Sequence, residues 1–282
     1  MRPDSRQVSA DDGASFGAAV LSLLVAALAL LGLTGTAAAT CLPVARAPDG
    51  FRPAVPTWTI PAAADPATGT IELTFLGHAS FLIESPQGVT IVTDYNDYLR
   101  APFAPDIATM NLAHSTHYSE NPEKDIKYLL RGWDERGGVA QHELTYKDVR
   151  VTSIPTNIRD FGGGTRRAGN SIFAFQVEGI CVVHLGHLHH TLTEKHLADL
   201  GKVDILLAAV DGTWTMGHDD MVQTINDIKP TMVVPMHYFG STVLETFLGR
   251  LAWPVRHSRV SAITMTRATL PDPPEVLVLP GR

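Results

Sequence analysis

Basic residues are few in this sequence, and nowhere do they form a long stripe. The 282 residues include 22 Lys and Arg against 29 Asp and Glu, a formal net charge of −7 at pH 7. Proteins that bind nucleic acid usually present a basic patch to the phosphates. DNA and RNA are therefore not expected as partners, whereas the 45% of hydrophobic residues suffices for a sizeable buried core.

Cysteine is also scarce, since only Cys41 and Cys181 occur. One disulfide between them is compatible with an oxidising compartment. The apolar surroundings of Cys181, in "GICVVHL", are explained more simply by a small buried hydrophobic side chain. The compartment must therefore be inferred from the N-terminal segment.

This N-terminal segment predicts export. Residues 16–34 are uncharged and mostly apolar, and the small residues 37–39 that follow resemble a signal-peptide cleavage site. Cleavage after Ala39 predicts a periplasmic or secreted protein. Alternatively, the uncut apolar run is long enough to anchor the chain in a membrane, or Cys41 is lipidated.

The chain accordingly divides into three parts. Residues 1–39 are a signal peptide or membrane anchor, 40–69 form a Pro- and Ala-rich tether, and 70–282 form a single folded domain. In that domain, strands are predicted at 71–93 as an antiparallel meander, and at 106–113, 148–154, 171–179, 180–185, 203–210 and 231–236. Helices are predicted at 121–131, at 195–201 behind a capping box at 191–194, and at 218–229. Hairpins followed by alternating helix and strand indicate an α/β sandwich of two sheets with helices outside.

Histidines follow the predicted strands. The stretch "HLGHLHH" at 184–190 places four imidazoles after an apolar strand, and His78, His114, His117 and His237 follow others. Strand ends gather at one edge of a sheet, where binding sites are usually built. Each imidazole has a donor and an acceptor that need partners, so the cluster indicates a metal site.

Five segments stand in an informative order: "LTFLGHASFLIE" (73–84), "VTIVTD" (89–94), "VVHLGHL" (182–188), "VDILLAAVDGTWTM" (203–216) and "KPTMVVPMHY" (229–238). This series resembles the metallo-β-lactamase superfamily, in particular the branch of ascorbate-6-phosphate lactonases and N-acylphosphatidylethanolamine phospholipases D. The resemblance implies a four-layer αββα sandwich of class α/β. It also implies one or two metal ions, usually zinc, and a bound hydroxide that hydrolyses an ester, lactone, amide or phosphodiester.

The main metal motif of that family, H-x-H-x-D-H, falls on "LAHSTHYSEN". There His117 keeps the register of a family histidine and His114 is displaced by one residue. Ser115, Ser119 and Glu120 stand where the resemblance implies ligands. Much of the family's metal motif is therefore missing.

The family's metal-bridging aspartate falls on His187, while the family histidines at His78 and His237 are kept. A carboxylate can bridge two metals, whereas a neutral imidazole offers one lone pair to one metal. We therefore predict a remodelled mononuclear site whose ligands come from His114, His117, His187, His190 and His237. Zinc suits three imidazoles with an open position, and manganese or iron are alternatives. We predict catalytic roles for His78 and Asp94, the latter alternatively as a carboxylate that orients a histidine or as a strand-end residue.

The loop "RDFGGGTRR" brings three arginines together around three glycines. Its residues Arg159, Arg166 and Arg167 could hold a small anionic substrate, or the loop is simply a mobile surface segment. The sequence thus predicts an exported metal-dependent hydrolase acting on an ester, lactone or phosphodiester. The alternative is a non-catalytic metal- or ligand-binding descendant of the same fold.

Overall fold

The computed structural model describes residues 69–160 and 162–281. All of them belong to one compact unit, Ala39–Arg282. The predicted signal peptide or anchor and all of the predicted tether at 40–69 except Gly69 lie outside the described residues. Within the described ranges, no helix is both long and apolar enough to cross a membrane.

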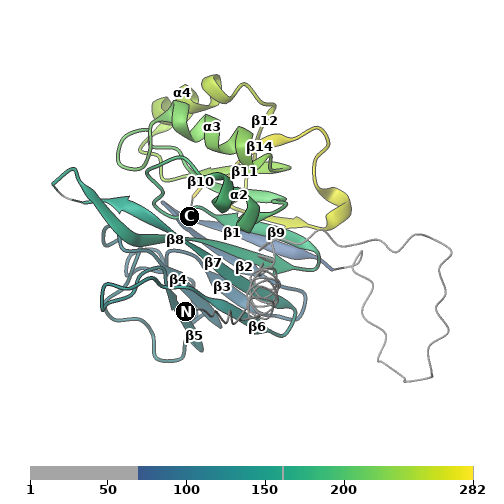
Figure 1. Cartoon of the computed structure of the whole chain (residues 1–282). Helices are drawn as coiled ribbons and strands as arrows, with labels where there is room; N and C mark the ends of the chain where they lie inside the picture. The colour runs from purple at the N-terminus through teal and green to yellow at the C-terminus, as the bar shows by residue number, and fades with distance from the viewer. Residues whose placement is uncertain (1–68, 161, 282) are drawn as a thin grey trace, which may run out of the picture. The chain divides into compact units, whose positions relative to one another are not determined.

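Two mixed β-sheets form the body of the protein (Figure 1). The six-stranded sheet has the order β13-β1-β2-β3-β4-β5, and the eight-stranded sheet has the order β12-β14-β11-β10-β9-β8-β7-β6. The strands of the first are β1 (Ile71–Gly77), β2 (Ser80–Glu84), β3 (Thr90–Val92), β4 (Ile107–Met110), β5 (Tyr128–Arg131) and β13 (Ala262–Met265). Those of the second are β6 (Glu143–Tyr146), β7 (Val149–Arg159), β8 (Thr165–Val177), β9 (Ile180–His184), β10 (Ile205–Ala209), β11 (Met232–Met236), β12 (Val255–His257) and β14 (Glu275–Val278).

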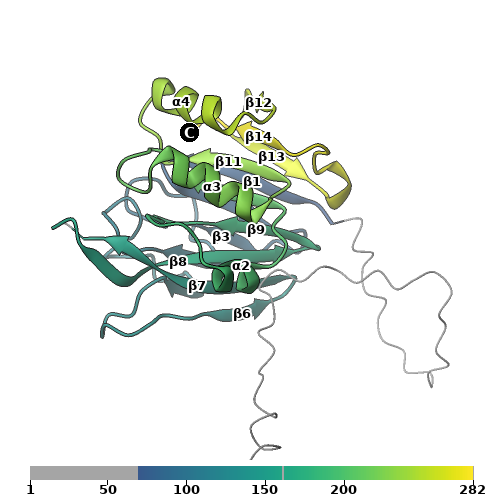
Figure 2. The same ribbon diagram turned by 45° about the horizontal axis from the view of Figure 1, so that its top comes forward.

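The core lies between the two sheets. Alternate residues of facing strands, such as Phe75 and Phe81 from one sheet and Phe173 and Val182 from the other, pack into one apolar cluster. The outer face of the eight-stranded sheet packs against α2 (Glu194–Leu200), α3 (His218–Ile228) and α4 (Ser241–Leu251). The helices α3 and α4 lie side by side (Figure 2). The predicted α/β sandwich is confirmed.

The outer face of the six-stranded sheet differs from the expected helical layer. Its apolar residues, including Leu82 and Val92, are covered by loop side chains such as Tyr95 and Trp133. The predicted helix at 121–131 is wrong, because its last four residues form the edge strand β5, which pairs in parallel with β4. Successive leucines suit a strand here, since Leu130 faces the core between the sheets and Leu129 the outer cluster.

The N-cap of α2 lies two residues after Thr191, where the predicted capping box begins. Its N-cap is Thr193, whose hydroxyl accepts from the His196 N–H, while the His196 ring accepts from the Thr193 N–H. This reciprocal pair satisfies two backbone donors at the helix start. His196 is therefore a capping residue.

The hairpin of β7 and β8 projects beyond the neighbouring strands (Figure 1). It connects through a tight turn in which the Asp160 carboxylate accepts N–H bonds from Gly162 and Gly164. The segment with three glycines, expected as a loop, is thus the tip of a paired ribbon. Arg159 ends one strand of the ribbon, and Arg166 and Arg167 lie on the other.

Candidate metal centre and its cleft

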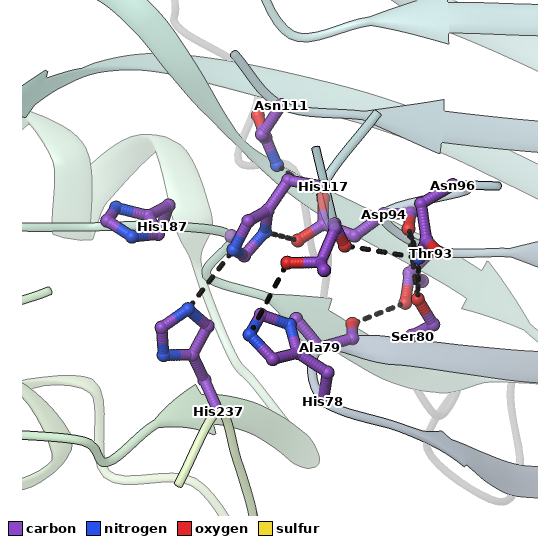
Figure 3. Close-up of polar contacts among 12 residues, drawn as sticks. His78, Ala79, Ser80, Thr93, Asp94, Asn96, Asn111, His117, His187 and His237 are labelled. Carbon is purple, nitrogen blue, oxygen red and sulfur yellow. Dashed lines mark hydrogen bonds and ion pairs between the residues drawn. The ribbon is translucent and has the colours of Figure 1, made fainter. Parts of the chain in front are cut away.

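Three histidines that are distant in sequence bring their Nε2 atoms together at the strand ends. The Nε2 of His237 lies 3.1 Å from that of His117 and 3.3 Å from that of His114. His78 completes a group of four whose nitrogen atoms lie within 4.8 Å of one another. Figure 3 shows His78, His117 and His237 turned toward one another, with His187 beside them.

The turns that carry these side chains are held in an uncommon backbone conformation. His78, Asp94 and His237 have φ angles of 52°, 42° and 55°. The His237 N–H donates to the His78 carbonyl at 2.6 Å and so joins the end of β11 to the turn between β1 and β2. Positive φ at a non-glycine residue is uncommon and clusters at functional sites. The link between the two sheets therefore brings His78 to His237.

Each of the three converging rings is oriented by a hydrogen bond at its Nδ1 atom. His117 Nδ1 lies 2.5 Å from the Asp94 carboxylate, and His237 Nδ1 lies 3.1 Å from Asp211. His114 Nδ1 lies 2.8 Å from the Thr116 hydroxyl. A carboxylate accepts the Nδ1 proton and leaves a lone pair on Nε2. Histidine ligands of metals are commonly held in this way.

The donor set fits a divalent cation. Nitrogen ligands of a tetrahedral zinc, at ~2.0–2.1 Å from the ion, are separated from one another by roughly 3.4 Å. The two Nε2 separations are close to that value, and lone pairs facing each other at such a distance repel unless a proton or cation lies between them. Asp94 and Asp211 are both buried, and their only ion-pair partners among the described residues are histidines. A divalent cation would balance both carboxylates.

Three further ring nitrogens at the site, on two histidines, have no partner among the described residues. His187 is only 6% exposed, yet neither of its ring nitrogens forms a hydrogen bond with a described residue. Its ring centre lies 4.9 Å from that of His117, 5.1 Å from that of His237 and 5.2 Å from that of His114. His78 Nδ1 is also buried without a partner. Buried polar atoms are rarely left unsatisfied, so these nitrogens indicate a ligand or a proton at this place.

Burial keeps these histidines in the form that can bind a metal. Burial, followed by repulsion from neighbouring histidines, lowers the pKa of His78 and of His187 to about 3. The same two causes lower the pKa of His114 to about 4. Burial also lowers the pKa of His117. These rings are therefore neutral at pH 7, as metal ligation requires.

The pKa values of the two carboxyl groups, Asp94 and Asp211, are shifted in opposite directions. Burial raises the pKa of Asp94 well above its ordinary value, although the hydrogen bond from Asn111 works against this. Burial would raise the pKa of Asp211 too, but hydrogen bonds from His237 and Thr215 outweigh it and lower that pKa. Asp211 also accepts the N–H groups of the turn at 213–215. Asp211 thus organises a turn and orients a histidine at once.

The sequence-predicted residues divide into those that reach the centre and those that do not. His78, His114, His117, His187 and His237 come together, and Asp94 lies behind His117. By contrast, His190 is engaged elsewhere, because its Nε2 accepts from the Asn157 N–H and its Nδ1 lies 2.8 Å from the Thr191 carbonyl.

The remaining histidine of interest, His184, is a satisfied core residue. Its Nε2 donates to the Ala79 carbonyl and its Nδ1 accepts from the Gly186 N–H. His184 therefore does not belong to the cluster of converging rings.

Two buried asparagines that sequence reasoning missed support the centre. Asn111 donates to Asp94, and its carbonyl accepts from the Ser171 N–H. Asn170 accepts the His187 N–H. The signal in the sequence was an asparagine at the polar end of an apolar strand, in "ATMN" and "GNSIF". Their partners lie in distant segments, so the signal alone could not assign these roles.

A cleft of about 990 Å³ opens over the centre. Both His114 and His187 line it, as do Arg159 and Arg166 from the projecting hairpin. Arg167 is not among its lining residues. The cleft therefore connects the histidines with two of the three predicted substrate-binding arginines.

Comparison with known proteins agrees with this architecture. Residues 72–237 match the family model of the beta-lactamase superfamily domain. A UPF0173 metal-dependent hydrolase from Archaeoglobus fulgidus is 24% identical over 203 residues, which cover 62% of this chain and 86% of the relative. One of the same name from Methanoculleus marisnigri is 29% identical over 183 residues, covering 60% and 81%.

Solved structures show the same fold. A protein of the metallo-beta-lactamase superfamily from Thermotoga maritima superposes with a TM-score of 0.56 at 24% identity, covering 75% of this chain and all of its own. Igni18, a metallo hydrolase from Ignicoccus hospitalis, superposes with a TM-score of 0.51 at 17% identity, covering 70% and 98%. The chain belongs to the beta-lactamase superfamily and is an enzyme of its metal-dependent hydrolase class.

Proposed function

We propose that this enzyme holds one metal ion, most simply zinc, through His114, His117 and His237, and hydrolyses an ester, lactone or phosphodiester. The observation that carries the proposal is the convergence of three Nε2 atoms, two of them on rings backed by buried carboxylates. His187 is placed to complete the ligand set from the cleft side. When bound, the metal would supply a Lewis acid and lower the pKa of a coordinated water.

The chain's own residues would prepare this chemistry. Asp94 and Asp211 hold the protons at Nδ1 of His117 and His237, so Nε2 of each ring remains an acceptor. We assign Asp94, predicted as catalytic, to this positioning role, because it is fully buried and does not line the cleft. His78 is neutral and has an unpartnered Nδ1 beside the other rings, which suits proton transfer or an additional contact to the metal.

Substrate class follows from where the site opens. Two of the clustered histidines, His114 and His187, line the cleft together with Arg159 and Arg166. A scissile group bound in the cleft would therefore lie close to the arginines. The proposed range of esters, lactones and phosphodiesters matches the branch of lactonases and phospholipases D that the sequence resembles.

The first experiment measures metal content and hydrolysis together. The full chain, prepared without a polyhistidine tag, is analysed for metal per chain, alongside His117→Ala, His237→Ala and the matched control His190→Ala. We expect about one metal in the parent and the control, little in the other two variants, and turnover of an ester, lactone or phosphodiester only where metal is present. Two metals per chain would refute a mononuclear centre. Metal binding without turnover of any of the three classes would favour the non-catalytic alternative.

We also propose that the protein is exported, to the periplasm or the medium, or stays anchored by residues 16–34. Cys181 is buried and disulfide-bonded, so it is more than a small hydrophobic residue. Cys41 is the only other cysteine in the sequence. Disulfides persist in oxidising compartments and are rare in the cytosol. Thiol alkylation before and after reduction, on fractionated cells, tests this: free thiols in freshly isolated protein would contradict export.

A further inference from the structure

The cleft over the metal centre has two chemically different walls. One is cationic and comes from the projecting hairpin, while the other is aromatic and comes from the turns after β10 and β11. Its volume of about 990 Å³ is at the upper end of the range for small-molecule sites, so it exceeds what a small hydrolysable group alone would need.

The cationic wall carries charge that is not neutralised within the described part of the chain. Arg166 pairs with Ile158 in the β7–β8 ladder, but its side chain forms no hydrogen bond or ion pair with a described residue. Arg159 donates to the carbonyls of Thr213 at 3.2 Å and Thr215 at 3.3 Å, and has no carboxylate partner. Asp160 also lines the cleft, where its carboxylate accepts from the N–H groups of Gly162 and Gly164, and the two arginines outnumber this one acidic side chain. In a protein with a net charge of −7, two unpaired arginines in one cleft are suited to an anion.

The aromatic wall is unusually exposed. Trp214 is 66% exposed and Phe239 is 58% exposed, and both line the cleft. The Phe239 ring lies 5.5 Å from the ring of His237 and 5.8 Å from that of His78. Large exposed aromatic side chains beside a site commonly mark ligand contact, because they lose unfavourable contact with water when covered.

The two walls are connected. Both carbonyls that accept from Arg159 belong to the turn that holds Trp214 and is itself organised by Asp211. Asp211 also orients His237, so Arg159, Trp214 and His237 are all connected to the turn at 213–215 by hydrogen bonds or by position in it. These bonds place Arg159 beside Trp214 in the cleft.

We propose that the cleft selects an anionic substrate that carries an apolar chain or ring, with the anionic group at Arg159 and Arg166 and the apolar group against Trp214 and Phe239. This deepens the proposed function and rests on it for the bond that is cleaved. Binding of the amphiphilic anion itself requires only the two walls.

Calorimetric binding of three matched probes tests the inference on the metal-loaded full chain. The probes are hexyl sulfate, hexanol and hexyltrimethylammonium, kept below micelle-forming concentrations, with methyl sulfate to remove the apolar arm. We expect hexyl sulfate to bind most tightly, and Arg166→Gln to weaken it roughly 10- to 100-fold, the range for losing a charge-assisted hydrogen bond. Trp214→Ala should weaken hexyl sulfate and hexanol alike.

Arg167→Gln is the matched control, because it removes the same charge from the next residue of β8, outside the cleft lining. It should leave binding of hexyl sulfate unchanged. Equal loss in Arg166→Gln and Arg167→Gln, or equal affinity for hexyl sulfate and hexanol, would overturn the inference. Because all substituted side chains are exposed, circular dichroism should show an unchanged fold.

Hydrolysis assays separate this inference from the proposed function. Selective binding of hexyl sulfate without turnover of any ester, lactone or phosphodiester would leave the cleft assignment standing and remove the hydrolytic proposal. Turnover with equal kcat/KM for a neutral ester and its anionic analogue would support the hydrolytic proposal and contradict the cleft assignment.

Discussion

Replacing Asp94 by asparagine should disable the metal centre without disturbing the backbone. Asn111 decides how the new amide can orient, because its own carbonyl accepts from the Ser171 N–H and its Nδ2 must therefore donate toward residue 94. The amide at 94 has to turn its oxygen to Asn111 and its NH2 to His117 Nδ1. That ring nitrogen must then accept, which moves the ring proton to Nε2, where it blocks the lone pair.

The expected magnitude follows from two losses. Removing the carboxylate partner of a histidine ligand typically costs 10- to 100-fold in metal affinity, which is ~1.4–2.7 kcal/mol. Asp94→Asn additionally removes one of the two buried negative charges that a divalent cation would balance. We therefore expect a loss at or above the upper end of this range. The positive φ of Asp94 is well tolerated by asparagine, so the backbone should be retained.

Competition with a chromophoric zinc chelator measures this affinity directly. Asp204→Asn provides the matched control. Asp204 is also a buried carboxylate, but it stands directly before β10, at the opposite end of that strand from Asp211, and it is bound to the Cys181 N–H and to Arg267. The control should lower stability and leave metal affinity near that of the parent. A folded Asp94→Asn protein that binds zinc within threefold of the parent would refute the assigned role of the carboxylate.

Three further predictions follow from the same site. Gly186→Ala and Gly88→Ala both place a side chain at positive φ, which costs about 1–3 kcal/mol of unfolding free energy. Only the new Cβ at 186 would also clash, because it would lie 2.3 Å from the Asn170 side chain and 2.5 Å from that of Asn111. Denaturant unfolding should therefore show the larger loss for Gly186→Ala, and an equal loss would contradict the clash. His187→Ala should reduce bound zinc measured by mass spectrometry, whereas His190→Ala should not; the opposite order would return His190 to the ligand set. The metal-free protein should lose thermal stability as pH falls from 6.5 toward 4. In this range the histidines of the unfolded chain bind protons, whereas the buried histidines of the folded protein, whose pKa values are lowered, stay neutral. Calorimetry in chelator that shows a constant Tm over this range would disprove it.

The strands could be predicted because their information is local. Short apolar or alternating runs such as 71–77 and 205–209 need no knowledge of their partners to be recognised as strands. The failed helix at 121–131 shows the limit of local information. Its Asn-Pro start favours a helix, but pairing with β4 and burial on two faces favour a strand, and those contacts are non-local.

In the candidate site, too, some features follow from local sequence and others depend on non-local contacts. Strand-end positions predicted that His78, His114, His117, the histidines of 184–190 and His237 would gather, since the ends of neighbouring strands meet at one edge of a sheet. The family resemblance singled out His187 within 184–190. Sequence proximity misled for His190, which lies three residues from His187 yet turns to the hairpin backbone. Its direction depends on the course of the chain after β9, which no local pattern encodes.

The sequence by itself determined the sandwich of strands, the family and the residue types that meet at the strand ends. Only the tertiary structure decided which nitrogen of each ring faces the centre, which carboxylate stands behind it, and which arginines share its cleft. The physical reason is the range of the interactions. Side-chain periodicity is set within a few residues, whereas the hydrogen bonds from His117 to Asp94, from His237 to Asp211 and from Ser171 to Asn111 join positions 23, 26 and 60 residues apart.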